Sequence, residues 1–169
     1  MRVRLRPGPL LLAGSFLAFG ACSPPPAEEP TESVPGPEPL VDAWVEMWNS
    51  YDLDRLPELF LADDRLTYFS SEREGLIRGF DAVVEHHRGF GFVPGGTATG
   101  SRLWLEEVEV QRFGDAAVVT AIWFFQGAQE GEAPGVQDPQ RGPVTIVCLL
   151  EEGEWRFVHM NFSEYLPPR

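Results

Sequence analysis

The sequence predicts an α+β domain in which three helices precede a mostly antiparallel sheet. Helical spacing of apolar residues recurs three times, always before residue 90. From about residue 101 onward the chain consists of long β-rich runs separated by short turns. Residues 38–169 are expected to form one domain, because a body of about 130 residues buries a core without disulfide bonds.

Apolar spacing and helix-capping residues predict the first two helices. Residues 40–51 place apolar side chains at i, i+3 and i+4, which is typical of an amphipathic helix. Asp54 can cap a second helix, because Pro57 then falls in the first turn, where its missing N–H is not needed. That helix is expected to end at 62–64 and to bury Leu56, Leu59 and Phe60.

Two short strands and a third helix follow. Residues 66–70 and 75–78 are predicted as strands joined by a polar turn. The third helix is expected from about Phe80 to Arg88, with Asp81 in its first turn, where a carboxylate suits the helix dipole. The glycine-rich stretch 89–100 then ends it.

The second half of the body predicts four strands and a partner subunit. The strands are expected at about 101–112, 116–126, 143–151 and 154–163, with tight turns at 114–115 and 152–153. In 116–125 both alternating faces are apolar, and an apolar sheet face needs cover. Because three helices can cover only one face, we expect the other face to bind a second copy in a homodimer.

Charge and cysteine usage exclude several kinds of partner. The formal net charge is −13, and removing Arg2, Arg4 and Arg6 leaves ten basic residues against 26 acidic ones. Such a chain repels phosphate backbones, so no nucleic-acid partner is expected. Of the two cysteines, Cys148 lies in an apolar run and is expected to be a buried core residue, so no disulfide is predicted.

The N-terminus is typical of an export signal. The three arginines precede an apolar stretch at 10–19 that is too short to span a bilayer. Phe19-Gly20-Ala21-Cys22 resembles a lipobox, in which the cysteine is diacylated and becomes the new N-terminus. We therefore expect a signal peptide at 1–21, a Pro/Glu-rich tether at 22–37, and a membrane contact through lipidated Cys22 alone. Ser23 after the cysteine favours the periplasmic face of an outer membrane, in a bacterial cell envelope.

The order of the elements and four sequence stretches carry a resemblance to a known fold. The stretches are AWVEMWNSYDLD (43–54), LADD (61–64), IRG (77–79) and GEWRFVHMNFS (153–163). The element order resembles that of the nuclear transport factor 2-like superfamily. The last stretch is similar to the Trp-x-x-Val-His-x-His-x-Ser pattern of SnoaL-like proteins and of the calmodulin-dependent kinase association domain, with Asn161 at the second His. The resemblance implies a strongly curved antiparallel or mixed sheet, three helices on its concave side, and a conical pocket.

Ketosteroid isomerases of this superfamily align with the first helices and strand without gaps. Their catalytic Tyr falls on Trp44 and their general-base Asp falls on Phe69, and a phenyl ring cannot accept a proton. That isomerase chemistry is therefore not expected. His159 with Asn161 could act as base and orienting group if their face of the last strand lines the pocket, and Tyr68 is a further candidate. The alternative interpretation is a hydrogen-bonded core or interface histidine.

No metal or cofactor is expected. His86 and His87 are adjacent, and neighbouring helical residues point about 100° apart, so they cannot chelate one ion together. The glycine-rich stretch 89–100 follows a helix, which is the wrong context for a phosphate-binding loop.

A set of aromatic side chains is expected to converge on one cavity if the cone prediction holds. We interpret the chain as a membrane-tethered module that binds a small apolar molecule in a hydrophobic pocket. Two alternatives remain open: a SnoaL-like isomerase, cyclase or hydrolase that uses His159, and a module for self-assembly or for binding an envelope protein. The aromatic residues could also simply fill a core. The predicted pocket residues are Trp44, Trp48, Phe60, Tyr68, Trp104, Trp123, Phe157 and His159.

Overall fold

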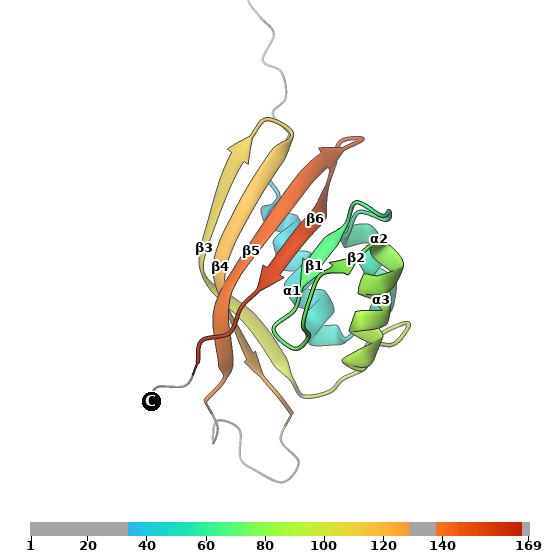
Figure 1. Cartoon of the computed structure of the whole chain (residues 1–169), viewed down its shortest axis with the longest axis vertical. Helices are drawn as coiled ribbons and strands as arrows, with labels where there is room; N and C mark the ends of the chain where they lie inside the picture. Colours follow the sequence, from blue (N-terminus) through green and yellow to red (C-terminus); the bar gives the residue numbers. More distant parts are fainter. Residues whose placement is uncertain (1–33, 129–137, 167–169) are drawn as a thin grey trace, which may run out of the picture. The chain divides into compact units, whose positions relative to one another are not determined.

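The computed structural model describes residues 34–128 and 138–166, which belong to one compact unit. It contains three α-helices, one 3₁₀ turn and a six-stranded mixed sheet in the order β2-β1-β6-β5-β4-β3 (Figure 1). The sheet is open, with β2 and β3 at its edges. The α+β prediction is confirmed, as are the position of the helices in the first half and the mixed, cone-like sheet. The described residues do not include the predicted signal peptide at 1–21. They also do not include Cys22 or most of the predicted tether at 22–37.

The helical segment before the sheet contains two corrections, to the start of the second helix and to its end, which lies at Leu59 and not at 62–64 as predicted. Helix α1 (Glu38–Ser50) ends where Tyr51 adopts left-handed backbone angles, with φ of 52°. The second helix begins earlier than predicted, as a 3₁₀ turn, η1 (Leu53–Arg55), that leads into α2 (Leu56–Leu59). Asp52 is its cap, because the Asp52 carboxylate accepts from the backbone N–H of Asp54 at 3.0 Å. The expectation that Asp54 caps the helix was therefore wrong.

The short strands attach the helical half to the sheet. Strand β1 (Thr67–Phe69) pairs antiparallel with β2 (Ile77–Arg78) and parallel with β6. Helix α3 (Phe80–Gly89) follows directly after β2. The parallel pairing of β1 with the last strand is what makes the sheet mixed, and it brings Tyr68 beside the C-terminal part of the sheet.

Four long strands form the antiparallel meander that was predicted. They are β3 (Arg102–Phe113), β4 (Ala116–Gln126), β5 (Gln140–Glu151) and β6 (Glu154–Phe162). The turns at 114–115 and 152–153 are confirmed, and Glu152 and Gly153 both have positive φ, which suits a two-residue hairpin turn. In Figure 1 the helices lie on one side of this meander, which we call the inner face.

The two faces of the meander differ in burial. On β4 the inner-face side chains Val119 and Trp123 are buried, whereas the outer-face side chains Val118, Ile122 and Phe124 are only half-buried. Both faces of this strand are apolar, as the sequence indicated. The helices cover the inner face alone, so the outer face is left with an apolar, partly exposed surface.

A bulge in β6 decides which of its side chains face inward. The pairing with β5 shifts register between Val147 and Cys148, opposite residues 157–159. As a result Phe157 and Met160 are both fully buried, although they are three residues apart. A regular strand would place residues of the same parity on one face. His159 pairs with Val147 and so lies on the outer face, with Asn161 two residues further on.

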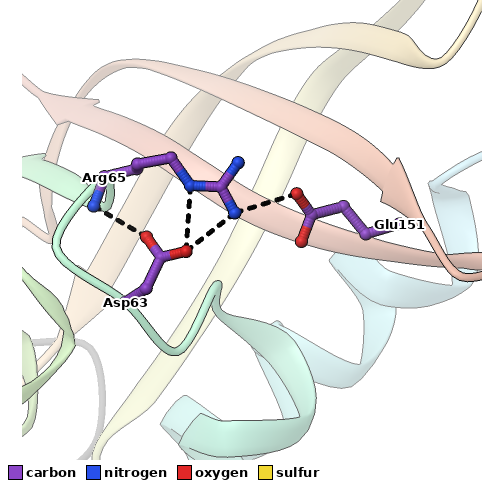
Figure 2. A network of polar contacts seen from close by, with 3 residues as sticks. All are labelled: Asp63, Arg65 and Glu151. Carbon is purple, nitrogen blue, oxygen red and sulfur yellow. Dashed lines mark hydrogen bonds and ion pairs between the residues drawn. The ribbon is translucent and has the colours of Figure 1, made fainter.

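A network of three polar side chains links the turn before β1 to the end of β5 (Figure 2). The guanidinium of Arg65 donates to Asp63 at 2.7 Å and to Glu151 at the end of β5 at 3.0 Å. The hydrogen bonds from Arg65 hold the pKa of Asp63 below its usual value. All three groups are exposed to solvent, so the network positions a turn and is expected to add little stability.

Candidate functional site

A cavity of about 200 Å³ lies between α1, β1 and the inner face of the sheet. Its wall is dominated by aromatic rings, with Leu103 completing the apolar surface. The polar lining residues are Ser70, Ser71, Glu72 and Gln140. The seven aromatic residues are Trp48, Tyr51, Tyr68, Phe90, Trp123, Phe125 and Phe162.

The cavity has a buried floor and an exposed mouth. Trp48, Tyr68 and Trp123 are each less than 10 % exposed and form the floor with their neighbours. Ser71 and Glu72, in the loop after β1, are exposed, as is Gln140 at the start of β5. The polar residues therefore gather at the opening, which is the arrangement of a pocket that admits a mainly apolar molecule.

Few polar atoms reach the floor of the cavity. The indole N–H of Trp123 already donates to the carbonyl of Ser163 at 2.8 Å. Two further polar groups, the hydroxyls of Tyr51 and Tyr68, belong to side chains that line the cavity. Burial raises the pKa of Tyr68 above its usual value, so its hydroxyl stays protonated and can donate to a ligand.

His87 lies directly behind this floor. It is fully buried, and its ring centroid is 5.7 Å from that of Trp48 and 5.8 Å from that of Tyr68. Its Nδ1 lies 2.8 Å from the carbonyl oxygen of Val83; because a carbonyl only accepts, Nδ1 carries the proton. Its Nε2 has no hydrogen-bond partner among the residues that the structure describes, and burial lowers the pKa of His87 to about 4.

His86, the neighbour of His87 on α3, has a perturbed imidazole as well. Burial also lowers the pKa of His86, with a smaller effect from the charge of Arg73. Among the described residues, no group of three or more His, Cys, Asp or Glu side chains is placed to hold a metal ion. Both imidazoles are therefore neutral near pH 7 and belong to the wall behind the cavity.

The structure brings only part of the predicted aromatic set to the cavity. Trp48, Tyr68 and Trp123 line it. Trp44, Phe60 and Phe157 belong to the fully buried core and do not line it.

Trp104 lies on the outer face, where its ring stacks on that of Phe124 with centroids 5.1 Å apart and an interplanar angle of 9°. It points to this face because it pairs with Phe124 across β3 and β4.

His159 and Asn161 face away from the cavity. Nδ1 of His159 lies 2.8 Å from the hydroxyl oxygen of Thr67 on the outer face, and burial lowers the pKa of His159. Asn161 is exposed beside it. The condition under which His159 and Asn161 could act on a ligand in the cavity is therefore not met.

Neither of the two residues that align with the catalytic positions of ketosteroid isomerases lines the cavity. Trp44 is fully buried, and its indole N–H has no hydrogen-bond partner within residues 34–128 and 138–166. Phe69 is 39 % exposed on the outer face, and its neighbour Tyr68 occupies the inward position of β1.

Several lining residues were not predicted. Tyr51 and Phe125 carried a usable signal, because Tyr51 shares the apolar side of the first helix and Phe125 has the same strand parity as Trp123. Phe90 and Glu72 lie in connections with no periodicity, so nothing in the sequence placed them at the cavity.

Within the described residues, no helix is long and apolar enough to cross a membrane.

Comparisons with known proteins agree with this architecture. A family model described as a SnoaL-like domain matches residues 38–167. A nuclear transport factor 2-like superfamily protein from Salmonella enterica is similar in structure, with a TM-score of 0.62 and 20% identity over 76% of this chain and 88% of that one. No curated protein sequence matches the chain.

Two further structures are similar. The calcium/calmodulin-dependent protein kinase II hub of S. rosetta has a TM-score of 0.60 and 24% identity, over 78% of this chain and 98% of that one. A protein assigned as a scytalone dehydratase from Novosphingobium aromaticivorans has a TM-score of 0.60 and 15% identity, over 76% and 81%. These likenesses show the fold, and the family match spans nearly all of the body that forms it. The chain thus belongs to the SnoaL-like domain family, within the nuclear transport factor 2-like fold.

Proposed function

We propose that this domain is a binding module that holds a small, largely apolar molecule in its aromatic cavity. The observation that carries the proposal is the cavity itself, whose floor consists of aromatic rings and whose polar side chains stand at the mouth. No histidine, cysteine or aspartate among the described residues lines it. The one carboxylate among the described lining residues, that of Glu72, is exposed at the mouth, and a floor of aromatic rings suits retention of a ligand better than proton transfer.

The volume limits the size of the ligand. A dry apolar cavity of about 150 Å³ is large enough for benzene. The 200 Å³ available here therefore accommodates one ring or a branched group of similar size, with any longer part leaving through the mouth. The hydroxyls of Tyr51 and Tyr68, two of the lining residues, are the groups from which the ligand would accept hydrogen bonds.

A cavity-filling variant tests the proposal. Phe125→Trp enlarges a side chain that lines the cavity, whereas Phe124→Trp makes the same change on the outer face of the same strand. Native mass spectrometry and a thermal-shift screen with small aromatic and branched compounds are the measurements. We expect bound mass or a raised Tm for the wild-type protein and for Phe124→Trp, and neither for Phe125→Trp. Binding that survives in Phe125→Trp would locate the ligand elsewhere and reject the proposal.

We further propose that the module is anchored to the outer membrane of a bacterial envelope through lipidated Cys22 and faces the periplasm. Support comes from the sequence alone, namely the basic residues, the apolar stretch and the lipobox-like ending. Labelling of expressing cells with a radioactive fatty acid should mark the wild-type chain and not Cys22→Ala. Equal labelling of the wild-type protein and of Cys22→Ala, or no labelling of the wild-type protein, would reject the proposed lipid anchor.

A second candidate function is self-association through the outer face. Val118, Ile122 and Phe124 leave an apolar surface there, and a second copy of the chain would cover it. The similarity to a protein kinase hub supports this weakly. Sedimentation of the purified protein should show a dimer, and Ile122→Asp should shift it to a monomer. Val93→Asp, which puts the same charge on an exposed apolar residue in the loop after α3 and away from the outer face, is the matched control. A wild-type monomer at all concentrations would exclude this candidate.

A further inference from the structure

We propose that the ligand of the cavity is a small organic cation, an alkylated amine or quaternary ammonium group. This inference rests on the proposed binding function and specifies the chemistry of its ligand. It follows from three features of the cavity: the arrangement of its rings, the charges around it, and its size.

Three rings that line the cavity lie at steep angles to the ring of Trp48. The ring of Trp48 meets that of Tyr51 at 74°, that of Phe125 at 74° and that of Phe90 at 53°, with centroids 5.4 to 6.4 Å apart. Rings that cross at such steep angles cannot all stack on one flat ligand. Because their faces point in different directions, these lining rings favour a compact group over a flat one. A cation placed within about 6 Å of an aromatic face is attracted by the negative potential of the ring.

The charges near the cavity favour the same ligand. Glu72 at the mouth is the one charged side chain among the described residues that line the cavity, so none of those residues is basic. Arg73 is next in the chain and does not line it. His86 and His87 behind the floor are neutral near pH 7, so they add no positive charge. The formal net charge of −13 attracts cations to the molecule as a whole.

The volume matches an ammonium head group. A cavity of 200 Å³ holds a trimethylammonium group with a short substituent, and its hydroxyl or ether oxygen can accept from Tyr51 or Tyr68. A neutral hydrocarbon of the same shape would gain the same apolar burial and lose the attraction to the rings and to Glu72.

A pair of isosteric probes tests the inference. Choline and 3,3-dimethylbutan-1-ol have the same shape, with a quaternary nitrogen in one and a carbon in the other. Titration of the purified protein with each, followed by NMR of the indole N–H signals and by calorimetry, measures the effect of the charge alone. We expect choline to bind about tenfold or more tightly than its neutral counterpart.

Matched variants place the cation in the cavity. Phe125→Leu removes one ring and is expected to weaken choline binding about threefold or more, while Phe124→Leu on the outer face leaves it unchanged. Glu72→Gln is expected to weaken it at low salt and less at high salt, while Glu74→Gln in the same loop has no effect.

The outcomes separate this inference from the function on which it rests. If the neutral probe binds as well as choline and Phe125→Leu weakens both alike, the cation inference is overturned and the binding function stands. If choline does not bind, the cation inference is also overturned. The compound screen with Phe125→Trp then decides the binding function by itself.

Discussion

Replacing His87 with leucine is expected to remove most of the sensitivity of the fold to mild acid. The side chain is fully buried among aromatic rings, and burial lowers its pKa to about 4 from the ordinary value of 6.5. An unfolded chain accepts a proton on this histidine near pH 6.5, whereas the folded chain accepts it only near pH 4. The stability is therefore fully present above pH 6.5 and falls as the pH drops toward 4.

The structure gives the size of this effect. The difference between a pKa of about 4 and one of 6.5 corresponds to about 3 kcal/mol of stability lost once the pH is below both values. At about pH 5 the expected loss is about 2 kcal/mol. Leucine has a similar volume, and it removes a buried Nε2 that has no partner. We therefore expect His87→Leu to change the stability at pH 7.5 by no more than about 1 kcal/mol.

Urea unfolding followed by tryptophan fluorescence, at several pH values between 7.5 and 4.5, measures the effect. Burial also lowers the pKa values of His86 and His159, so the quantity of interest is the difference between wild type and variant. That difference should grow by about 2 kcal/mol as the pH falls to 5. His86→Leu is the matched control on the same helix, and its pH profile should stay closer to wild type because His86 is only half-buried. Parallel pH profiles for wild type and His87→Leu would show that His87 is not buried in a neutral form.

Three other substitutions have expected outcomes. His159→Ala should leave ligand binding unchanged in the same calorimetric titration, because the side chain contacts Thr67 on the outer face; a loss of binding would mean that it reaches the cavity. Gly142→Ala should lower the free energy of unfolding by about 1 to 3 kcal/mol, since a Cβ there would overlap the backbone of Ser163 and lie 2.8 Å from Cα of Glu164. Gly89→Ala, where a Cβ meets nothing within 4 Å and the backbone has no positive φ, should be milder, and equal effects in urea unfolding would contradict the steric explanation. Arg65→Ala should raise the pKa of Asp63 toward its ordinary value in an NMR titration, and an unchanged pKa would show that the hydrogen bonds of Figure 2 do not form in solution.

Most of the fold could be predicted from local patterns in the sequence. The apolar spacing of α1 and the turn residues between the long strands each specify one element with little help from the rest of the chain. The second helix shows the limit of this approach. Asp52 and Asp54 are both residues that can cap a helix. In the structure Asp52 is the cap, and the Asp54 carboxylate instead accepts from the backbone N–H of Gly95, 41 residues away, at 3.0 Å.

The candidate site was harder to predict, because it depends on the parity of side chains along strands. Trp123 could be placed since β4 is regular in this part, so its alternation holds. His159 could not be placed in the same way. The sequence of β6 allows Trp155, Phe157, His159 and Asn161 to share one face, and the bulge between them moves the last two to the other face. A bulge depends on the partner strand and leaves no reliable signal in a single sequence.

The same bulge separates the two surfaces to which functions are proposed. Before it, β6 contributes Phe157 to the core; after it, Phe162 reaches the cavity while His159 joins the outer face. Because the side chains of β4 alternate between these surfaces, Phe125 and Phe124 report on the cavity and on the outer face respectively. If ligand binding and self-association both occur, substitutions at these two neighbours should affect them independently. The two rings lie on opposite faces of β4, so no single substitution is expected to abolish both ligand binding and self-association. A variant of Phe124 or Phe125 that lost both activities would mean that the ligand and the second copy bind at a shared surface, and would contradict this placement.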